Sequence, residues 1–350
     1  MTTSSVSRRT LLGAVGAGAL GLAACSRPST SSGGSSGASG GQSARTLRFA
    51  YEGPKGTAQE IAANIFGKEL ESASNGKLKT VQYPGAQLGG EPELLQKIRT
   101  GDIDFIISST ANAAQIAPPS GVLSVHYLFP NKDAVIAAIG DDQVNQAYID
   151  MADKTMKGAK PLTLFTLPLR NFYAAFPVRS VADIKGKKIR VQATNTEDLT
   201  FGAYGAQPVH MPFPELYTAL QTGTVQLAEN ALTYYGLNKH YEVAPIMSFS
   251  EHEGNCQVIW VAEKTWSAMS KDQQDAVTQA AAKVRSDQPK QAFELQTTLK
   301  KKYGDLGVKF IEDVDKKSFS SISQPLQDKI AQGLGADAVA ILKATRKAIG

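Results

Sequence analysis

The alternation of hydrophobic and polar residues changes its period several times along the first third of the chain. Short apolar runs typical of strands lie at Thr46–Tyr51, Lys77–Tyr83 and Ile103–Ile107. Between them, Gly56–Ser74 and Glu91–Thr100 carry apolar residues at helical spacing. This β-α-β-α-β order predicts a parallel or mixed sheet with helices on its faces, and therefore an α/β fold.

The same two periods predict the elements in the rest of the chain. Ser270–Leu299 is a long helical stretch that begins with a serine N-cap and a glutamine three residues later. The other elements expected are helices at Asn131–Lys157, Asn195–Tyr204 and Pro212–Gly223 and at the C-terminus from Lys343 to Gly350, and strands at Leu162–Thr166, Lys187–Val191, Ala206–Val209, Thr224–Leu227 and Asn255–Ala262.

The first 25 residues have the pattern of an export signal rather than of a folded segment. A twin-arginine pattern at Arg8 and Arg9 precedes an apolar stretch that is too short to span a bilayer and ends in L-A-A-C at Cys25. These letters are typical of a bacterial lipobox, and an ordinary signal peptide with a chance cysteine is the alternative. We expect residues 1–25 to end at a lipidated Cys25 and the Ser/Gly-rich residues 26–45 to form a flexible tether.

The length and net charge of the chain limit the number of lobes and the kinds of partner that can be expected. The residues from about Ala44 to Gly350 exceed the usual size of one hydrophobic core, so two lobes are expected. The formal charge of the chain is +5, and removing the charges of Arg8 and Arg9 leaves +3, which is too small to indicate nucleic-acid binding. No run after the export signal is apolar and long enough for a transmembrane helix.

Arg190 is the strongest candidate for ligand chemistry. It lies in the strand-like run K-K-I-R-V, where alternation places Ile189 and Val191 on one face and Arg190 on the other. A guanidinium offers a planar fork of donors that matches a carboxylate with two parallel hydrogen bonds. From the residues alone, a solvated arginine on an edge strand remains the alternative.

The stretch from Asp183 to Leu232 resembles the solute-binding subunits of TRAP transporters, DctP-type family. It reads D-I-K-G-K-K-I-R-V and then M-P-F-P-E-L-Y-T-A-L-Q-T-G, in the order of that family's motifs. The resemblance implies that Arg190 is the ligand of a substrate carboxylate. It also implies a small organic acid (a dicarboxylate, sugar acid or keto acid) as ligand, and TRAP membrane permease subunits as partners.

The resemblance further implies the architecture. We expect an α/β, two-lobed periplasmic binding protein fold with mixed sheets, a hinge between the lobes and a long helix that spans both. Residues 46–167 and 256–295 are expected to form lobe one, and residues 168–255 and 296–350 are expected to form lobe two. Closure of such lobes around a ligand buries the carboxylate against Arg190.

Five further residues are candidates for the ligand site. The family places a second arginine near Arg170, for which a solvated residue at a strand start is the alternative. Phe213 is expected to floor the pocket or to pack in the core, and Asn230 to supply an amide or to cap a turn. Glu52 and Ser109 follow predicted strands, where ligands of open α/β sheets bind, although helix capping or turn formation explains them equally well.

The sequence contains no clear catalytic or metal motif. Its four histidines lie outside every zinc spacing, and it has no G-x-S-x-G, no C-x-x-C and no Walker loop. We therefore expect a receptor without enzymatic activity, metal or cofactor, held by its lipid anchor at the outer face of the cytoplasmic membrane. An exported enzyme that acts on organic acids is the alternative.

Overall fold

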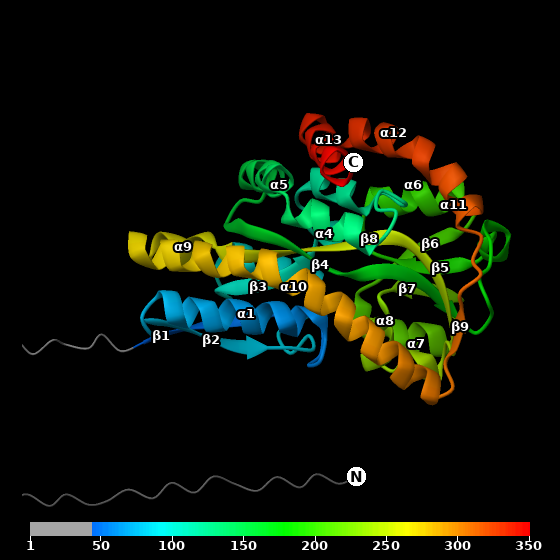
Figure 1. Cartoon of the computed structure of the whole chain (residues 1–350), viewed down its shortest axis with the longest axis horizontal. Coiled ribbons are helices and arrows are strands. Elements are labelled where there is room, and N and C mark those ends of the chain that lie inside the picture. Colours follow the sequence, from blue (N-terminus) through cyan, green and yellow to red (C-terminus); the bar gives the residue numbers. More distant parts are fainter. Residues whose placement is uncertain (1–43) are drawn as a thin grey trace, which may run out of the picture. The chain divides into compact units, whose positions relative to one another are not determined.

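The computed structural model describes residues 44–350, whose arrangement Figure 1 shows. The expected lipidation of Cys25 and most of the expected tether at 26–45 lie outside the described residues. Within the described part, no helix is long and apolar enough to cross a membrane.

Three parallel strands joined by two helices form the first part of the sheet. β1 (Arg45–Ala50) lies between β2 (Leu78–Tyr83) and β3 (Phe105–Ser109). The connections are α1 (Ala58–Ala73) and α2 (Glu91–Thr100). The predicted β-α-β-α-β order is thus confirmed, and β3 continues two residues beyond its predicted end because its last residues pair with another buried strand.

Two long antiparallel strands form the middle of the sheet. β4 (Ala159–Ala174) and β8 (Ile246–Ala262) pair with each other, and β3 pairs with the last part of β8. The pairing of β4 with β8 is irregular between Leu167 and Arg170 and again between Arg170 and Phe172. These strands therefore connect the first part of the sheet to the second through a locally disturbed ladder.

The sequence predicted only part of each long strand. It ended one at Thr166 and placed Arg170 after it, whereas Arg170 lies inside β4 and is 2% exposed. The charged and amide residues of this segment break the apolar pattern, although the structure buries them against polar partners. The reading of Arg170 as a solvated residue is therefore wrong.

The second part of the sheet is again parallel. β5 (Lys188–Val191) pairs with β6 (Gln207–His210) on one side and with β7 (Leu227–Asn230) on the other. The predicted strand at Thr224–Leu227 is wrong, because β7 begins at Leu227 and pairs with β4 as far as Asn230. Glu229 and Asn230 therefore lie in a buried strand.

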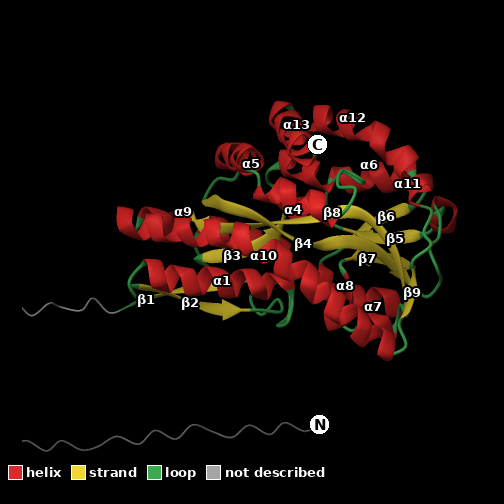
Figure 2. Cartoon of the chain, viewed as in Figure 1, coloured by secondary structure: helices red, strands yellow, loops and turns green. Residues whose placement is uncertain are grey.

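The complete sheet has nine strands in the described residues, in the order β2-β1-β3-β8-β4-β7-β5-β6, with β9 (Lys309–Ile311) paired to the start of β8. Figure 2 shows helices on both of its faces. Successive residues of β1 and β3 enter different hydrophobic clusters, as alternation requires. One cluster includes residues of α1, α10 (Lys271–Asp305) and α8 (Leu232–Leu237), and the other includes residues of α2, α4 (Lys132–Gly140) and α5 (Asp142–Thr155).

The long helix is confirmed and extends beyond its predicted end. The 35 residues of α10 begin at the capping box of Ser270 and Gln273 and pack against α1, β4 and α8. The helix thus lies along both parts of the sheet, as Figure 1 shows. The C-terminal helix α13 (Ala336–Ile349) packs against α4 and α5.

Shorter elements complete the described chain. They are the helices α3 (Thr110–Ala113), α6 (Asn195–Ala203), α7 (Leu216–Gln221), α9 (Glu263–Ser267), α11 (Lys316–Ser323) and α12 (Gln327–Leu334), and the 3-10 turns η1 (Pro118–Ser124), η2 (Val181–Ile184), η3 (Phe213–Glu215), η4 (His240–Glu242) and η5 (Gln324–Leu326).

Candidate functional site

All six residues singled out as ligand candidates line one cavity with an empty volume of about 250 Å³. They are Glu52, Ser109, Arg170, Arg190, Phe213 and Asn230. The other lining residues are Glu91, Asn112, Leu167, Gln192, Tyr234, Asn255 and Gln257. The lining is therefore mostly polar, and it contains two arginines and two glutamates.

The sheet itself brings these side chains together. Glu52 follows β1, Ser109 ends β3, and Asn230 ends β7, so three carboxyl ends of strands meet at the cavity. Arg190 comes from β5, and the irregular middle of β4 contributes Arg170. Residues that are distant in the sequence thus converge because their strands are neighbours in the sheet.

Arg190 carries a buried positive charge without a carboxylate partner. Its side chain is 2% exposed, and its Nε and Nη2 donate to the carbonyl oxygen of Met211 at 3.1 and 2.9 Å. The guanidinium lies 5.5 Å from the ring centre of Phe213. Among residues 44–350, Arg190 forms no ion pair with a carboxylate. Burial lowers the pKa of Arg190, because it disfavours the charged form of the guanidinium. The cavity therefore presents an uncompensated cation to an incoming anion.

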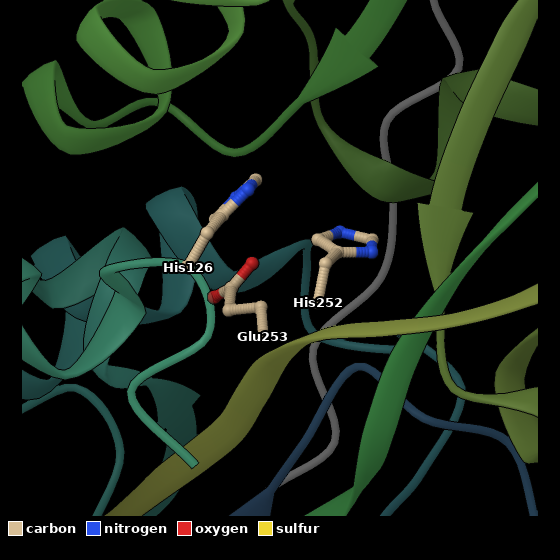
Figure 3. Close-up of side chains that lie close together, drawn as sticks. All are labelled: His126, His252 and Glu253. Carbon is tan, nitrogen blue, oxygen red and sulfur yellow. The ribbon is translucent and has the colours of Figure 1, made fainter. Parts of the chain in front are cut away.

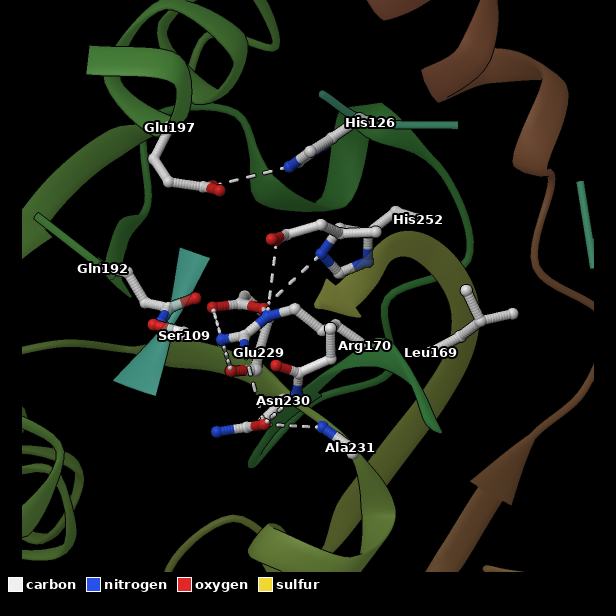
Figure 4. Close-up of polar contacts among 12 residues, drawn as sticks. Ser109, His126, Leu169, Arg170, Gln192, Glu197, Glu229, Asn230, Ala231 and His252 are labelled. Atoms are coloured by element: carbon white, nitrogen blue, oxygen red, sulfur yellow. Dashed lines mark hydrogen bonds and ion pairs between the residues drawn. The ribbon is translucent and has the colours of Figure 1, made fainter. Parts of the chain in front are cut away.

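Arg170 is instead held by acidic side chains. Its Nε bonds one carboxylate oxygen of Glu229, and its Nη2 lies 2.5 Å from the other (Figure 4). Nε also lies 3.3 Å from Glu253, the residue opposite it on β8. Burial alone would raise the pKa of Glu229, but the Arg170 charge lowers it to about 2. Most of the donors of Arg170 are thus engaged within the protein.

Asn230 uses its two amide atoms differently. Its Oδ1 accepts from the backbone N–H of Ala231 at 2.8 Å and from Nδ2 of Asn255 at 3.1 Å. In the described chain, its Nδ2 has no hydrogen-bond partner. The oxygen therefore fixes the start of α8, as the turn-cap interpretation expected, and the nitrogen keeps both of its hydrogens for a ligand.

One part of the cavity lining, called here the acidic end, consists of Glu52 and Glu91. Oε2 of Glu52 accepts from the backbone N–H of Glu91 at 2.9 Å. Oε2 of Glu91 accepts from the hydroxyl of Ser109 at 2.7 Å and from Nδ2 of Asn112 at 2.8 Å. Burial, and then the charge of Glu91, raises the pKa of Glu52 to about 8. At neutral pH this end offers a protonated carboxyl and several acceptors to the hydroxyl groups of a ligand.

Ser109 and Phe213 combine the roles that were expected as alternatives. The hydroxyl of Ser109 accepts a hydrogen bond from the backbone N–H of Asn112 and so caps α3. It also accepts a hydrogen bond from Nε2 of Gln192 at 2.7 Å. Phe213 is 5% exposed and packs edge-on against Tyr234 with 5.5 Å between ring centres. Each residue serves the fold and still lines the cavity.

Several lining residues escaped the sequence analysis. Asn255 and Gln257 are two polar positions at strand spacing inside an apolar run, which indicates one polar face on β8. Glu91 was taken only as a helix start, although it has three side-chain or backbone donors around one oxygen. Gln192 directly follows β5, a position that the strand-end rule could have identified.

Comparisons with known proteins give one consistent result. Residues 49–333 match the DctP family, described as bacterial extracellular solute-binding protein, family 7. The chain is 29% identical to the 2,3-diketo-L-gulonate-binding periplasmic protein YiaO of Escherichia coli over 79% of this chain and 84% of that protein.

Two solved TRAP periplasmic solute-binding proteins share the fold. One, from Bradyrhizobium, was solved with galacturonate and is 26% identical, with a TM-score of 0.81 over 87% of this chain and 100% of the other. Another, from Chromohalobacter salexigens, was solved with D-glucuronate and is 27% identical, with a TM-score of 0.79 over 86% of this chain and 99% of the other.

Proposed function

Because the chain belongs to family 7 of the bacterial extracellular solute-binding proteins, we propose that it is the solute receptor of a TRAP transporter. The family match covers residues 49–333, which include every residue that lines the cavity. In this function the protein binds a small organic acid and delivers it to the permease subunits in the membrane.

Arg190 is the observation that supports this function best. A buried guanidinium without a carboxylate partner is costly unless an anion completes it. Its Nε and Nη2 are held by Met211, so the side chain is fixed before a ligand arrives. A carboxylate that reaches Arg190 therefore gains a charge-assisted hydrogen bond with little ordering of the protein.

The rest of the cavity favours an acid with one carboxylate and several hydroxyl groups. The Glu91 carboxylate would repel a second carboxylate, whereas hydroxyl groups can both donate to acceptors and accept from amides. Nδ2 of Asn230 is a free donor, and the amides of Asn255 and Gln257 also face the cavity. The uronic acids held by two solved relatives have this composition.

We propose that two lobes close around the acid, with the hinge at the middle of the long strands. The ladder between β4 and β8 is irregular directly after Leu167, where the boundary between the two lobes was expected. Breaks of this kind are suited to absorb a change of backbone angle. Closure would remove water from the carboxylate and so strengthen its interaction with Arg190.

The protein is further proposed to act without chemistry on its ligand and to be anchored through lipid on Cys25. The cavity lining includes no histidine, cysteine or lysine, and its one serine, Ser109, donates to Glu91. The L-A-A-C motif that ends at Cys25 supports the anchor.

Calorimetric titration with a panel of acids tests the function. The panel contains D-galacturonate, D-glucuronate, a hydroxylated aldonate, a keto acid and succinate, and each mixture is analysed afterwards for products. Stoichiometric binding of one acid, recovered unchanged, is expected. Sustained conversion of an acid would favour the exported enzyme, and absence of binding by the whole panel would contradict the receptor for organic acids.

A further inference from the structure

Four ionisable side chains gather beside Arg170 without lining the cavity. His126 follows η1, Glu197 lies in the first turn of α6, and His252 and Glu253 are neighbours in β8. Each of the four is at most 3% exposed. Figure 3 shows that His126 lies beside His252 and Glu253 of β8, and Figure 4 adds Glu197.

The group contains buried nitrogen and oxygen atoms that form no hydrogen bond within the described chain. Nε2 of His126, Nε2 of His252 and Oε2 of Glu253 are buried and lack a hydrogen-bond partner in the described chain, as do both carboxylate oxygens of Glu197. Buried polar atoms normally find partners, because leaving one unsatisfied costs free energy. Five such atoms in one group point to a species that binds all of them.

Their spacing is close to that of the ligands of one metal ion. The ligand atoms of His126, His252 and Glu253 lie within 4.8 Å of one another. Oε2 of Glu197 lies 3.4 Å from Nε2 of His126. Tetrahedral zinc with bonds of about 2.0–2.2 Å holds its nitrogen and oxygen ligands roughly 3.3 Å apart, so the three ligand atoms would have to move closer together around an ion.

The other ring nitrogens are already occupied in the way that metal-bound histidines require. Nδ1 of His126 lies 3.1 Å from the hydroxyl of Tyr204, and Nδ1 of His252 lies 2.7 Å from the hydroxyl of Ser250. The ring of His252 is also stacked on Phe172 at 4.3 Å. Hydrogen bonds of this kind orient an imidazole and leave Nε2 as the ligand atom.

The local charge also favours a cation. Glu197, Glu229 and Glu253 are three carboxylates around one guanidinium, that of Arg170. Acidic side chains thus outnumber basic ones at this place, and a bound divalent cation would hold Glu197 and Glu253 as carboxylates.

We propose that His126, His252 and Glu253, with Glu197 as fourth ligand, form a buried structural site for a divalent transition metal, of which zinc fits best. Two imidazoles with two carboxylates suit zinc rather than magnesium or calcium, which prefer oxygen ligands. The ion would tie the segment after η1 to α6 and β8. The sequence predicted no metal because the two histidines lie far apart along the chain and in no zinc motif.

Metal content tests this site independently of any organic acid. The full chain is unfolded in guanidinium with a chelator, freed of both, and refolded with one equivalent of ZnCl₂; a folded, chelator-treated sample is incubated with zinc in parallel. After desalting, elemental mass spectrometry should find one zinc per chain by at least one route. Refolding with cobalt(II) should give the intense visible bands of four-coordinate cobalt, which report ligand geometry directly.

Matched variants separate this site from adventitious binding. Glu253→Gln and His126→Gln remove one ligand each and should weaken zinc binding by at least about 100-fold in a chelator competition. Ser250→Ala keeps all ligands but releases Nδ1 of His252, so a loss of roughly tenfold is expected. His210→Gln is the control, because His210 is an exposed histidine 2.9 Å from Asp198 and should leave the zinc content unchanged.

Three results would overturn the proposal. The first is folded wild-type protein, verified by circular dichroism, that retains no zinc by either route. The second is equal zinc affinity in wild type and Ser250→Ala together with equal affinity in Glu253→Gln. The third is loss of zinc in His210→Gln alone, which would assign the metal to the surface.

Discussion

The Glu229 carboxylate accepts hydrogen bonds from Nε and Nη2 of Arg170. The two buried arginines of the cavity therefore differ in their partners. In the part of the chain that the structure describes, Arg190 donates only to a backbone carbonyl, that of Met211. One arginine is therefore neutralised by the protein and stabilises the packing of β4 against β7. The other keeps its charge for a ligand, and the two should respond differently to the same substitution.

Replacing Arg190 should weaken ligand binding in two steps. Arg190→Lys keeps the charge but loses the planar fork, and binding of the best acid in the panel should fall roughly ten- to a hundredfold. Arg190→Ala should cost more, because the ligand carboxylate would be buried without a partner. Calorimetric titration measures both. Arg48→Ala is the control, since Arg48 is an exposed arginine 3.8 Å from Asp104, and equal affinities of wild type and Arg190→Ala would place the carboxylate elsewhere.

Replacing Arg170 should instead reduce the stability of the fold. Arg170→Ala leaves Glu229 buried without its partner, and the free energy of unfolding should drop by about 3–5 kcal/mol. Arg190→Ala should change it much less, because within residues 44–350 no carboxylate lies at ion-pair distance from Arg190. Urea unfolding of the two ligand-free variants at pH 7 compares them. Equal losses of unfolding free energy in the two variants would show that the ion pair of Arg170 with Glu229 makes no specific contribution to stability.

Glu52 should make the ligand-free protein less stable as pH rises from about 4.5 to about 8. Its pKa is raised to about 8 from the ordinary value of 4.5, so between these values the folded state holds a proton that the unfolded chain has released. The stability contribution is complete below the lower value and declines toward the upper one. Glu52→Gln should flatten this part of the pH profile, measured by urea midpoints; an unchanged slope in the variant would contradict the assignment.

The acidic end of the cavity should select against a second carboxylate. D-galacturonate or D-glucuronate is expected to bind at least about tenfold more tightly than succinate, because Glu91 accepts hydroxyl groups but repels a buried carboxylate. Competition titrations at pH 7.5 give the ratio. Tighter binding of succinate than of both uronic acids would assign the site to dicarboxylates while leaving the role of Arg190 intact.

The lipid anchor is tested by fractionation. Wild-type protein expressed with its own signal should sediment with membranes and incorporate a labelled fatty acid, whereas Cys25→Ala should do neither. Cys256→Ala is a matched control, because Cys256 is a buried cysteine in β8 with no role in anchoring. Membrane retention of Cys25→Ala without label in either protein would contradict lipidation.

The sequence predicted the chemistry of the site better than its geometry. Arg190 could be identified because a strand of ordinary alternation aims it, and because the surrounding motifs resemble one family. The strand position of Glu229 could not, since its charge interrupts the apolar pattern and only its pairing with Arg170 explains its burial. Sequence spacing likewise did not indicate that His126 and His252 are neighbours. The two residues are far apart in the sequence, and the fold brings their ring centres to within 4.7 Å.

The position of β8 in the sheet has a consequence for biosynthesis. β3 and β4 are made early, but the strand that lies between them ends only at Ala262. Until β8 has been made, the edges of β3 and β4 that pair with it have no partner. Unpaired strand edges tend to pair with other chains. Truncation before β8 should therefore yield aggregates rather than a smaller folded domain.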